Sequence, residues 1–442
     1  MIFVCELGVK GASHEKVNSA FLRGVVLAYP GERVRLFADP SHINALQHVA
    51  TIDGLDLSAV DYVSIPIGDP DGPAQFLKYT RQLRSIFQQA VAARCSRILF
   101  LSASPAIQVQ AKRQQAKSAF RNVELCFVLH AAFEAVATDK VQPLDIPPLP
   151  AGSQQLFDVA RTRGWSYVFS VAARQMWRRL SPVRAAWAAF SGKYLAVRRV
   201  MDWRHSDKVR YIALSPHIIA NASRYLNTDA MHISALVLPT VFRDYQPHLS
   251  DDYPRFAVFG YGNSAMLHAV LKSLSENEVS HPYEIKIIGM DNRGTTGFAN
   301  INAVSPGKFM DREDMERHVA DVDMFLILYD RSRYRLSCSN AVLEALSYSK
   351  PILHLANDCV DYFDQPTAPI GYREMDVDGF ASKMCQIIEN FAAFRPELQQ
   401  FGRNLESLRA RYRLESQLTQ FRAAFEGQPP GQSPPLRGKP QS

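Results

Sequence analysis

The stretch YRLSCSNAVLEALSYSKPIL, residues 334–353, joins a loop of small polar residues to an apolar helical pattern that carries one acid, Glu344. The helical pattern ends at Lys350 and Pro351, and the apolar run that follows predicts a strand. A helix that begins in such a loop can bind an anion, because its first backbone N–H groups lack partners within the helix and small side chains leave them accessible. We therefore expect a ligand site here, with Glu344 available to accept hydrogen bonds from the bound ligand. The simpler alternative is that Glu344 only complements the helix dipole.

The same alternation of apolar runs and amphipathic stretches extends over most of the chain on both sides of this stretch. The runs that predict strands are residues 1–7, 33–39, 60–67, 96–104, 123–130, 255–259, 283–291, 323–330 and 350–356, and residues 207–227 continue the pattern as a strand followed by a helix. Short apolar strands that alternate with helices are typical of parallel sheets covered by helices on both faces. The expected fold class is therefore α/β, with two tandem Rossmann-like, doubly wound domains that face a cleft.

The expected domain boundaries follow from the places where this alternation breaks. We expect a first domain over residues 1–245 with an insertion at about 141–205, a second domain over 250–410, a helix over 411–426 that crosses back to the first domain, and a disordered Pro/Gly/Ser-rich tail over 427–442.

Composition indicates an ordinary globular protein of 442 residues, of which 47% are hydrophobic and 21% are charged. The six cysteines are scattered without metal-ligand spacing, which favours reduced thiols in a cytosolic protein. Cys338 has no evident activating partner, so we do not expect it to be a nucleophile. No basic region precedes the first strand and no window of membrane-spanning length lacks charge, so we expect neither a signal peptide nor a transmembrane helix.

Residues 161–204 differ from the rest of the chain. They contain all four tryptophans, nine arginines and Lys193, against a single acid, Asp202. Tryptophan favours the lipid headgroup layer, and each basic residue near an anionic membrane contributes about 1 kcal/mol. We therefore expect this segment to hold the protein on the inner face of the cell membrane. An insertion helix that packs its tryptophans on the first domain is the alternative, and nucleic-acid binding is a third interpretation that we do not adopt.

The loop GVKGASH at residues 8–14, the second strand–helix half and the pattern SxxxVLEALSYSKPIL together resemble GT-B glycosyltransferases, in particular the retaining family four type. The resemblance covers most of residues 1–425 except about 141–205. It implies that the second domain binds a nucleotide-diphosphate sugar, that the first binds the acceptor, and that no metal or other cofactor is needed. The acidic triplets at 69–71, 321–323 and 376–378 imitate a metal-binding DxD motif, but we interpret them as solvated turns.

The resemblance also implies a set of donor-binding residues. They are Gly260, Tyr261, Gly262, Asn263, Gly289, Lys308, Phe309, Arg335, Ser337, Ser339, Asn340 and Glu344. The family has two glutamates eight residues apart in this region. Glu344 matches the second, but Leu336 stands at the first position. A basic pair that the family has after the first strand of this domain is also missing, and Arg331, Arg333 and Arg335 are candidate substitutes.

In the first domain, the loop residues Gly8, Gly11, Ser13 and His14 are expected to face the acceptor, because glycines allow close approach to a ligand. His130 ends a predicted strand, at the position where family members keep a histidine near the reacting sugar. We therefore expect His130 and Glu344 to be the catalytic residues, with His130 positioning hydroxyl groups or moving a proton.

The resemblance implies transfer of a sugar from a nucleotide-diphosphate sugar to a saccharide acceptor in bacterial polysaccharide or glycoconjugate synthesis. We expect this acceptor to be lipid-linked, because residues 161–204 predict binding to a membrane surface. Two alternatives stay open. The GxGxxA spacing of Gly260, Gly262 and Ala265, with Asp291, also suits an NAD-dependent oxidoreductase. Leu336 and the missing basic pair suit a sugar-nucleotide-binding protein without catalytic activity.

Overall fold

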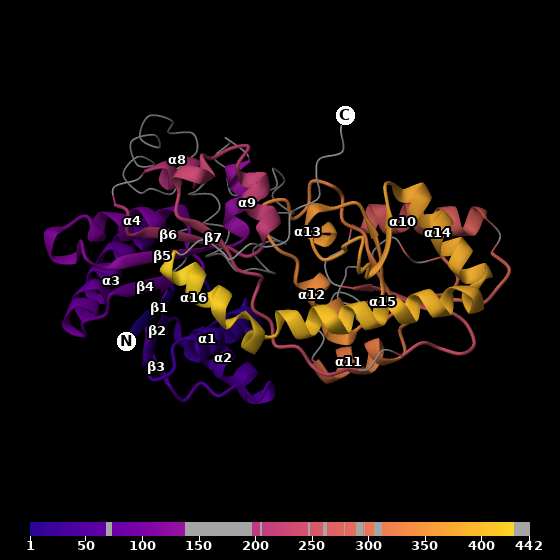
Figure 1. The fold of residues 1–442 in the computed structure, drawn as a ribbon, viewed down its shortest axis with the longest axis horizontal. Coiled ribbons are helices and arrows are strands. Elements are labelled where there is room, and N and C mark those ends of the chain that lie inside the picture. The colour runs from indigo at the N-terminus through magenta and orange to yellow at the C-terminus, as the bar shows by residue number, and fades with distance from the viewer. Residues whose placement is uncertain are drawn as a thin grey trace, which may run out of the picture.

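The computed structural model describes residues 1–67, 73–137, 197–203, 206–245, 248–259, 263–277, 279–288, 295, 297–304 and 312–427. Two domains lie side by side, each built around its own parallel sheet (Figure 1). The prediction of an α/β fold with two doubly wound domains is confirmed.

The first domain contains a parallel sheet with the strand order β3-β2-β1-β4-β5-β6-β7. Its strands are β1 (Ile2–Glu6), β2 (Val34–Ala38), β3 (Val60–Ser64), β4 (Arg97–Phe100), β5 (Glu124–Leu129), β6 (Val209–Ala213) and β7 (Ile233–Ala235). Its α-helices are α1 (Glu15–Ala28), α2 (Pro40–Ile52), α3 (Pro73–Ala92), α4 (Pro105–Gln115), α8 (Val197–Asp202) and α9 (Pro216–Ala222). Short 3-10 helices are η1 (Ser118–Phe120), η2 (Ala131–Val136) and η3 (Thr228–Ala230).

The second domain repeats this arrangement with the strand order β10-β9-β8-β11-β12-β13. Its strands are β8 (Arg255–Phe259), β9 (Glu284–Ile288), β10 (Ile301–Ala303), β11 (Met324–Ile327), β12 (Ile352–Leu355) and β13 (Gly371–Glu374). Its helices are α10 (Ser264–Glu276), α11 (Arg312–Ala320), α12 (Asn340–Tyr348), α13 (Asp358–Asp361), α14 (Val377–Glu389) and α15 (Phe391–Tyr412), and η4 (Leu414–Gln417) and α16 (Leu418–Glu426) follow.

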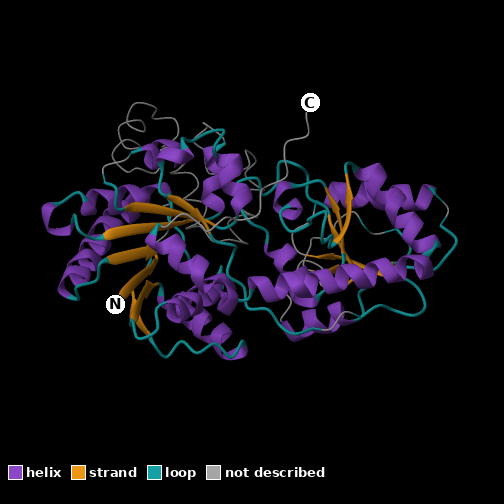
Figure 2. Ribbon diagram, viewed as in Figure 1, coloured by secondary structure: helices purple, strands orange, loops and turns teal. Residues whose placement is uncertain are grey.

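The central strands β1, β8 and β11 are apolar except at two ends, where Glu6 closes β1 and Arg255 begins β8, because helices cover both faces of each sheet (Figure 2). Phe3 and Val4 in β1 and Phe256 and Val258 in β8 are completely buried. In both sheets the strand order reverses direction next to the first strand, between β1 and β4 and between β8 and β11. Ligands of such sheets bind outside the carboxyl ends of the strands at this point, so the topology singles out the loops after these strands.

The end of the chain returns from the second domain to the first. Helix α15 runs along the second domain, and α16 lies over the first, where it contacts α1, β6 and β7 (Figure 1). Phe421 of α16 is completely buried against Phe21 of α1, with 5.6 Å between the ring centroids. Gly24 makes this contact possible, because a Cβ at this position would lie 2.2 Å from Cζ of Phe421. A glycine in the middle of α1 is therefore explained by the close approach of α16.

A buried lysine fixes the point where the chain re-enters the first domain through α8. Lys112 of α4 donates hydrogen bonds to the carbonyl oxygens of Val200 (2.6 Å) and Trp203 (3.0 Å). Burial lowers the pKa of Lys112 to about 8. The carbonyl groups at the end of α8, which lack partners within the helix, are thus satisfied by the lysine.

The predicted membrane-binding segment lies almost entirely outside the described residues, since only 197–203 of residues 161–204 are described. In the described part of the chain, no helix combines the length and apolar character needed to span a bilayer. The predicted tail lies outside the described residues except for Gly427.

Candidate functional site

A chain of buried polar groups lies at the carboxyl end of β1. The Asn18 side-chain nitrogen is 3.1 Å from a Glu6 carboxyl oxygen and 3.0 Å from Nε2 of His42, while Nδ1 of His42 is 2.8 Å from the carbonyl oxygen of Gly11. The carbonyl can only accept, so Nδ1 of His42 carries the proton and Nε2 accepts from Asn18. The network therefore holds the loop at Gly11, where the backbone takes a positive φ of 58°.

Glu6 is buried in an environment that favours its neutral form. Its exposed fraction is 0%, and burial raises the pKa of Glu6 from 4.5 to about 7. One carboxyl oxygen also accepts a hydrogen bond from the backbone N–H of Gly8 at 3.1 Å. The carboxyl group of Glu6 thus holds both the start of the loop, at Gly8, and, through Asn18, its middle.

The pKa of Glu6 predicts a specific pH dependence of stability. Between pH 4.5 and 7 the unfolded chain has released this proton and the folded chain still holds it, so stability falls as pH rises through this window. The total loss above pH 7 is about 3 kcal/mol, from 1.36 kcal/mol per pKa unit. Glu6→Gln cannot ionise, so we expect urea unfolding to show the variant gaining stability relative to wild type as pH rises from 4.5 to 7. A difference that does not change with pH would contradict the buried, proton-holding Glu6.

His14 and His130 lie next to each other at the end of this loop. Their ring centroids are 4.1 Å apart, although 116 residues separate them in the sequence. His14 has a left-handed backbone (φ 62°) directly before α1, and its Nδ1 is buried without a hydrogen-bond partner among the described residues. Burial lowers the pKa of both histidines, that of His130 to about 4, and each imidazole disfavours a charge on its neighbours. Both rings are therefore neutral at pH 7 and can accept a proton or a hydrogen bond.

The loop between β11 and α12, together with the start of α12, carries most of the described donor-site candidates. Ser339 caps α12, since its Oγ accepts from the backbone N–H of Ala341 at 3.2 Å and lies 2.7 Å from the Tyr329 hydroxyl. The Ser339 hydroxyl is thus engaged within the protein, and Ser339 contributes to a ligand site by starting the helix. Asn340 is exposed at the first helical position, and its side-chain nitrogen donates to Oε1 of Glu344 at 3.1 Å.

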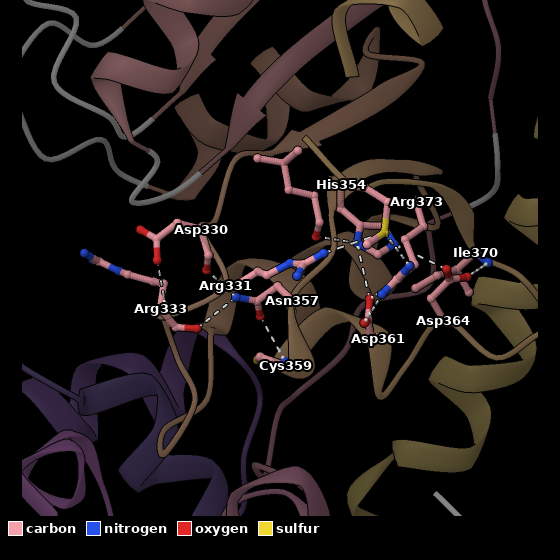
Figure 3. A network of polar contacts seen from close by, with 12 residues as sticks. Asp330, Arg331, Arg333, His354, Asn357, Cys359, Asp361, Asp364, Ile370 and Arg373 are labelled. Carbon is pink, nitrogen blue, oxygen red and sulfur yellow. Dashed lines mark hydrogen bonds and ion pairs between the residues drawn. The ribbon is translucent and has the colours of Figure 1, made fainter. Parts of the chain in front are cut away.

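A polar network around Asn357, which lies between β12 and α13, supports the first half of this loop (Figure 3). The side-chain nitrogen of Asn357 donates to the carbonyl oxygens of Asp330 and Arg333, both at 2.8 Å. The side chains of Arg331 and Arg333 point in opposite directions, and Arg331 reaches toward the sulfur of Met375 at 3.9 Å (Figure 3). Arg331 and Arg333 therefore do not point toward one shared phosphate position. This arrangement does not support the hypothesis that they replace a phosphate-binding basic pair together with Arg335.

The first domain binds the second half of the same loop. His217 of α9 lies with Nε2 3.0 Å from the Tyr334 carbonyl oxygen and 3.1 Å from that of Ser337, so Nε2 carries the proton. Asn221 donates to the Arg335 carbonyl oxygen at 3.1 Å, and the Cys338 thiol donates to that of Leu214 at 2.9 Å. The loop shape therefore depends on both domains.

Two carboxylates complete the interface near these groups. Glu134 of η2 accepts hydrogen bonds from the Ser337 hydroxyl (2.7 Å) and the Leu336 backbone N–H (3.1 Å) through one oxygen. Glu344 lies 3.9 Å from the Lys16 ammonium group in the first turn of α1, two residues after His14. The structure thus brings the loop that carries His14 and the start of α12 to the same interface.

The remaining predicted residues have different outcomes. Asn263 caps α10 by accepting from the backbone N–H groups of Ala265 and Met266 at 3.1 and 3.2 Å. Ser13 is exposed in the loop before α1. Six predicted donor-site residues lie outside the described residues: Gly260, Tyr261, Gly262, Gly289, Lys308 and Phe309. Asp291 also lies outside them.

Sequence reasoning missed three residues that hold the loop over residues 8–14, Glu6, Asn18 and His42, and two residues of the interface, Glu134 and His217. Glu6 offered a signal, because an acid at the end of an otherwise apolar buried strand requires a reason. Glu134 follows His130 by four residues and could have been noted as part of the same turn. No local pattern marks Asn18, His42 or His217, whose partners come from other elements.

Comparisons with known proteins give a fold and no family. No protein-family model matches the sequence, and no curated protein sequence matches it. Solved structures do. A glycosyltransferase from Rickettsia africae ESF-5 has a TM-score of 0.56 at 9% identity, with 96% of this chain and 97% of that one covered.

Two further solved structures have the same extent of similarity. The lipopolysaccharide outer core galactosyltransferase WaaB has a TM-score of 0.51 at 11% identity, and UGT89C1 from Arabidopsis thaliana, complexed with UDP-L-rhamnose, has 0.51 at 10%. Both matches cover 96% of this chain and 98% of the other. At these identities the similarity establishes the architecture alone. The chain therefore has the GT-B fold, as the sequence predicted.

Proposed function

We propose that this GT-B chain is a glycosyltransferase that moves a sugar from a nucleotide-diphosphate sugar to a saccharide acceptor at the interface of its two domains. The observation that carries the proposal is the meeting of two sets of groups from different sheets. The neutral pair His14–His130 comes from the first domain, and the start of α12 with Glu344 comes from the second. The contact between Lys16 and Glu344 joins the two sets.

The donor side of the proposal rests on the start of α12. The backbone N–H groups at the start of this nine-residue helix and its dipole favour a diphosphate, without a metal ion. Small side chains around Cys338 and Ser339 allow the backbone to approach it. Oε1 of Glu344 is engaged by Asn340 and lies near Lys16, which leaves the other carboxylate oxygen to accept from the ribose hydroxyls.

The acceptor side rests on the loop over residues 8–14 and on His130. Buried, neutral imidazoles can accept a hydrogen bond or a proton from an acceptor hydroxyl at neutral pH. The network from Glu6 to Gly11 fixes the loop, so His14 meets His130 without a further ordering cost. We extend the proposal to a lipid-linked saccharide at a membrane surface on the charge and tryptophan content of residues 161–204 alone.

A nucleotide panel tests the proposal by thermal stabilisation. The panel contains UDP, GDP, ADP, CMP and NAD(H). We expect one of the nucleoside diphosphates UDP, GDP or ADP to raise the melting temperature, because a ligand at one hundred times its Kd stabilises the folded state by about 2.7 kcal/mol. Glu344→Ala should lose most of this shift, since a hydrogen bond to a charged group contributes about 1.5–3 kcal/mol. Glu276→Ala, an exposed acid on α10, is the matched control and should keep the shift.

The other outcomes of the panel separate the alternatives. A rise in melting temperature with NAD(H) alone would replace the proposal with the alternative hypothesis of an NAD-dependent oxidoreductase. A nucleoside diphosphate shift without transfer to any saccharide acceptor would identify a sugar-nucleotide-binding protein. Equal shifts in the wild type and Glu344→Ala would remove Glu344 from the site.

A further inference from the structure

Glu134 of the first domain places its carboxylate against the loop between β11 and α12 of the second domain. Its Oε1 accepts from the Ser337 hydroxyl at 2.7 Å and from the Leu336 N–H at 3.1 Å, across more than 200 positions of sequence. Residues 331–339 contain no acid of their own. The Leu336 side chain is fully buried in the apolar cluster that continues into the first domain, so it cannot contact a ligand. Glu134 therefore supplies the negative charge at this point of the loop.

The position of Glu134 is fixed relative to the histidine pair. η2 begins directly after His130, and the backbone N–H of Phe133 donates to the His130 carbonyl oxygen at 2.7 Å. Phe133 and Val136 are buried and anchor this short helix in the first domain. One anchored turn thus carries His130 toward His14 and Glu134 toward Ser337.

The carboxylate has capacity left for a ligand. Its second oxygen makes no hydrogen bond to the part of the chain that the structure describes, and the side chain is only half-buried. A carboxylate accepts hydrogen bonds from hydroxyl groups and repels phosphate. A diphosphate at the start of α12 would therefore place the group attached to it, and not its own oxygens, against Glu134.

We infer that Glu134 binds the transferred sugar by accepting hydrogen bonds from its hydroxyl groups through the free carboxylate oxygen, while the other oxygen holds Ser337 and Leu336. This inference rests on the proposed function. It makes the first domain part of the donor site, so the donor sugar is bound fully only when the two domains are in contact.

The test uses Glu134→Gln, because the amide oxygen of Gln can still accept from Ser337 and Leu336 while the free carboxylate oxygen is replaced by an NH2 donor. The probes are UDP, GDP and ADP, and UDP-glucose, UDP-galactose, GDP-mannose and ADP-glucose, titrated by calorimetry into the full chain. We expect the Kd of the bound nucleotide sugar to rise about tenfold or more, the cost of losing a charged hydrogen bond. The Kd of the matching free nucleoside diphosphate should stay unchanged.

Asn221→Ala is the matched control, because it removes a contact of the first domain with the same loop but lies on α9 and offers no acid. The contacts of His217 and Leu214 with the same loop stay in this variant and keep Glu134 against Ser337, so we expect it to affect the nucleotide and the nucleotide sugar equally. The melting temperature of each variant checks that it is folded.

Three results would overturn the inference while leaving the proposed function intact. Glu134→Gln could weaken both ligands equally, as in Asn221→Ala, which would make Glu134 only a domain contact. It could bind the free nucleoside diphosphate more tightly, which would mean that the Glu134 carboxylate lies next to the phosphates and repels them, and not next to the sugar. It could change neither Kd. If wild-type protein binds none of the probes, the proposed function fails and the inference fails with it.

Discussion

His130→Ala should lower the turnover of sugar transfer by about 10²- to 10⁴-fold, the usual contribution of a positioned acid or base. The reason is that His130 holds a neutral ring against His14 at the end of β5, with a pKa lowered to about 4 by burial. Its ring therefore stays neutral throughout the neutral pH range, with a nitrogen lone pair available to an acceptor hydroxyl. Steady-state kinetics with the donor found by the nucleotide panel measure the effect.

Two control variants make this prediction specific. His281→Ala removes an exposed histidine that pairs with Glu389 in the second domain, and it should keep wild-type turnover. His130→Asn retains a hydrogen-bonding side chain but cannot take up a proton, so recovery of activity by this variant would assign His130 a positioning role. Wild-type turnover in a folded His130→Ala protein would remove His130 from the catalytic residues.

Much of the fold could be predicted from the sequence because its physical cause is local. Strands covered on both faces must be apolar throughout, so runs such as that around Phe3 and Val4 are visible without knowing their neighbours. The start of α12 was visible for a similar reason, since Ser339 caps the helix through its own backbone neighbours.

The site was predicted less completely because its residues act through distant partners. His14 and His130 were each identified, but their contact depends on how β1 and β5 align in the sheet. Glu134 was missed because its two hydrogen-bond donors lie in the other domain. The sequence shows Leu336 in place of the acid that the resemblance implies, and only the structure shows that a carboxylate from the other domain accepts from its backbone N–H.

Phe421→Ala should reduce the free energy of unfolding of the first domain by about 3–5 kcal/mol, the cost of truncating a fully buried phenylalanine. Phe421 is completely buried, lies 5.6 Å from the Phe21 ring and is stacked with Phe425 at 6.3 Å. Losing it removes the main apolar contact of α16 with α1, so the end of the chain should detach more readily from the first domain. Urea unfolding measures the change, and Phe394→Ala on the half-buried face of α15 is a control that should cost less.

Gly24 allows a second test of how α16 packs, because the effect of Gly24→Ala on the free energy of unfolding should change sign when Phe421 is removed. In the wild type, Gly24→Ala should destabilise the protein, because the new Cβ would lie 2.2 Å from Cζ of Phe421. In the Phe421→Ala background that ring is absent, and the same substitution should become stabilising by up to about 1 kcal/mol, since alanine is the better helix former. The coupling of the two sites should therefore be large, as expected for residues in direct contact. Additive effects of the two substitutions would mean that α16 does not pack on α1 through Phe421 and Gly24.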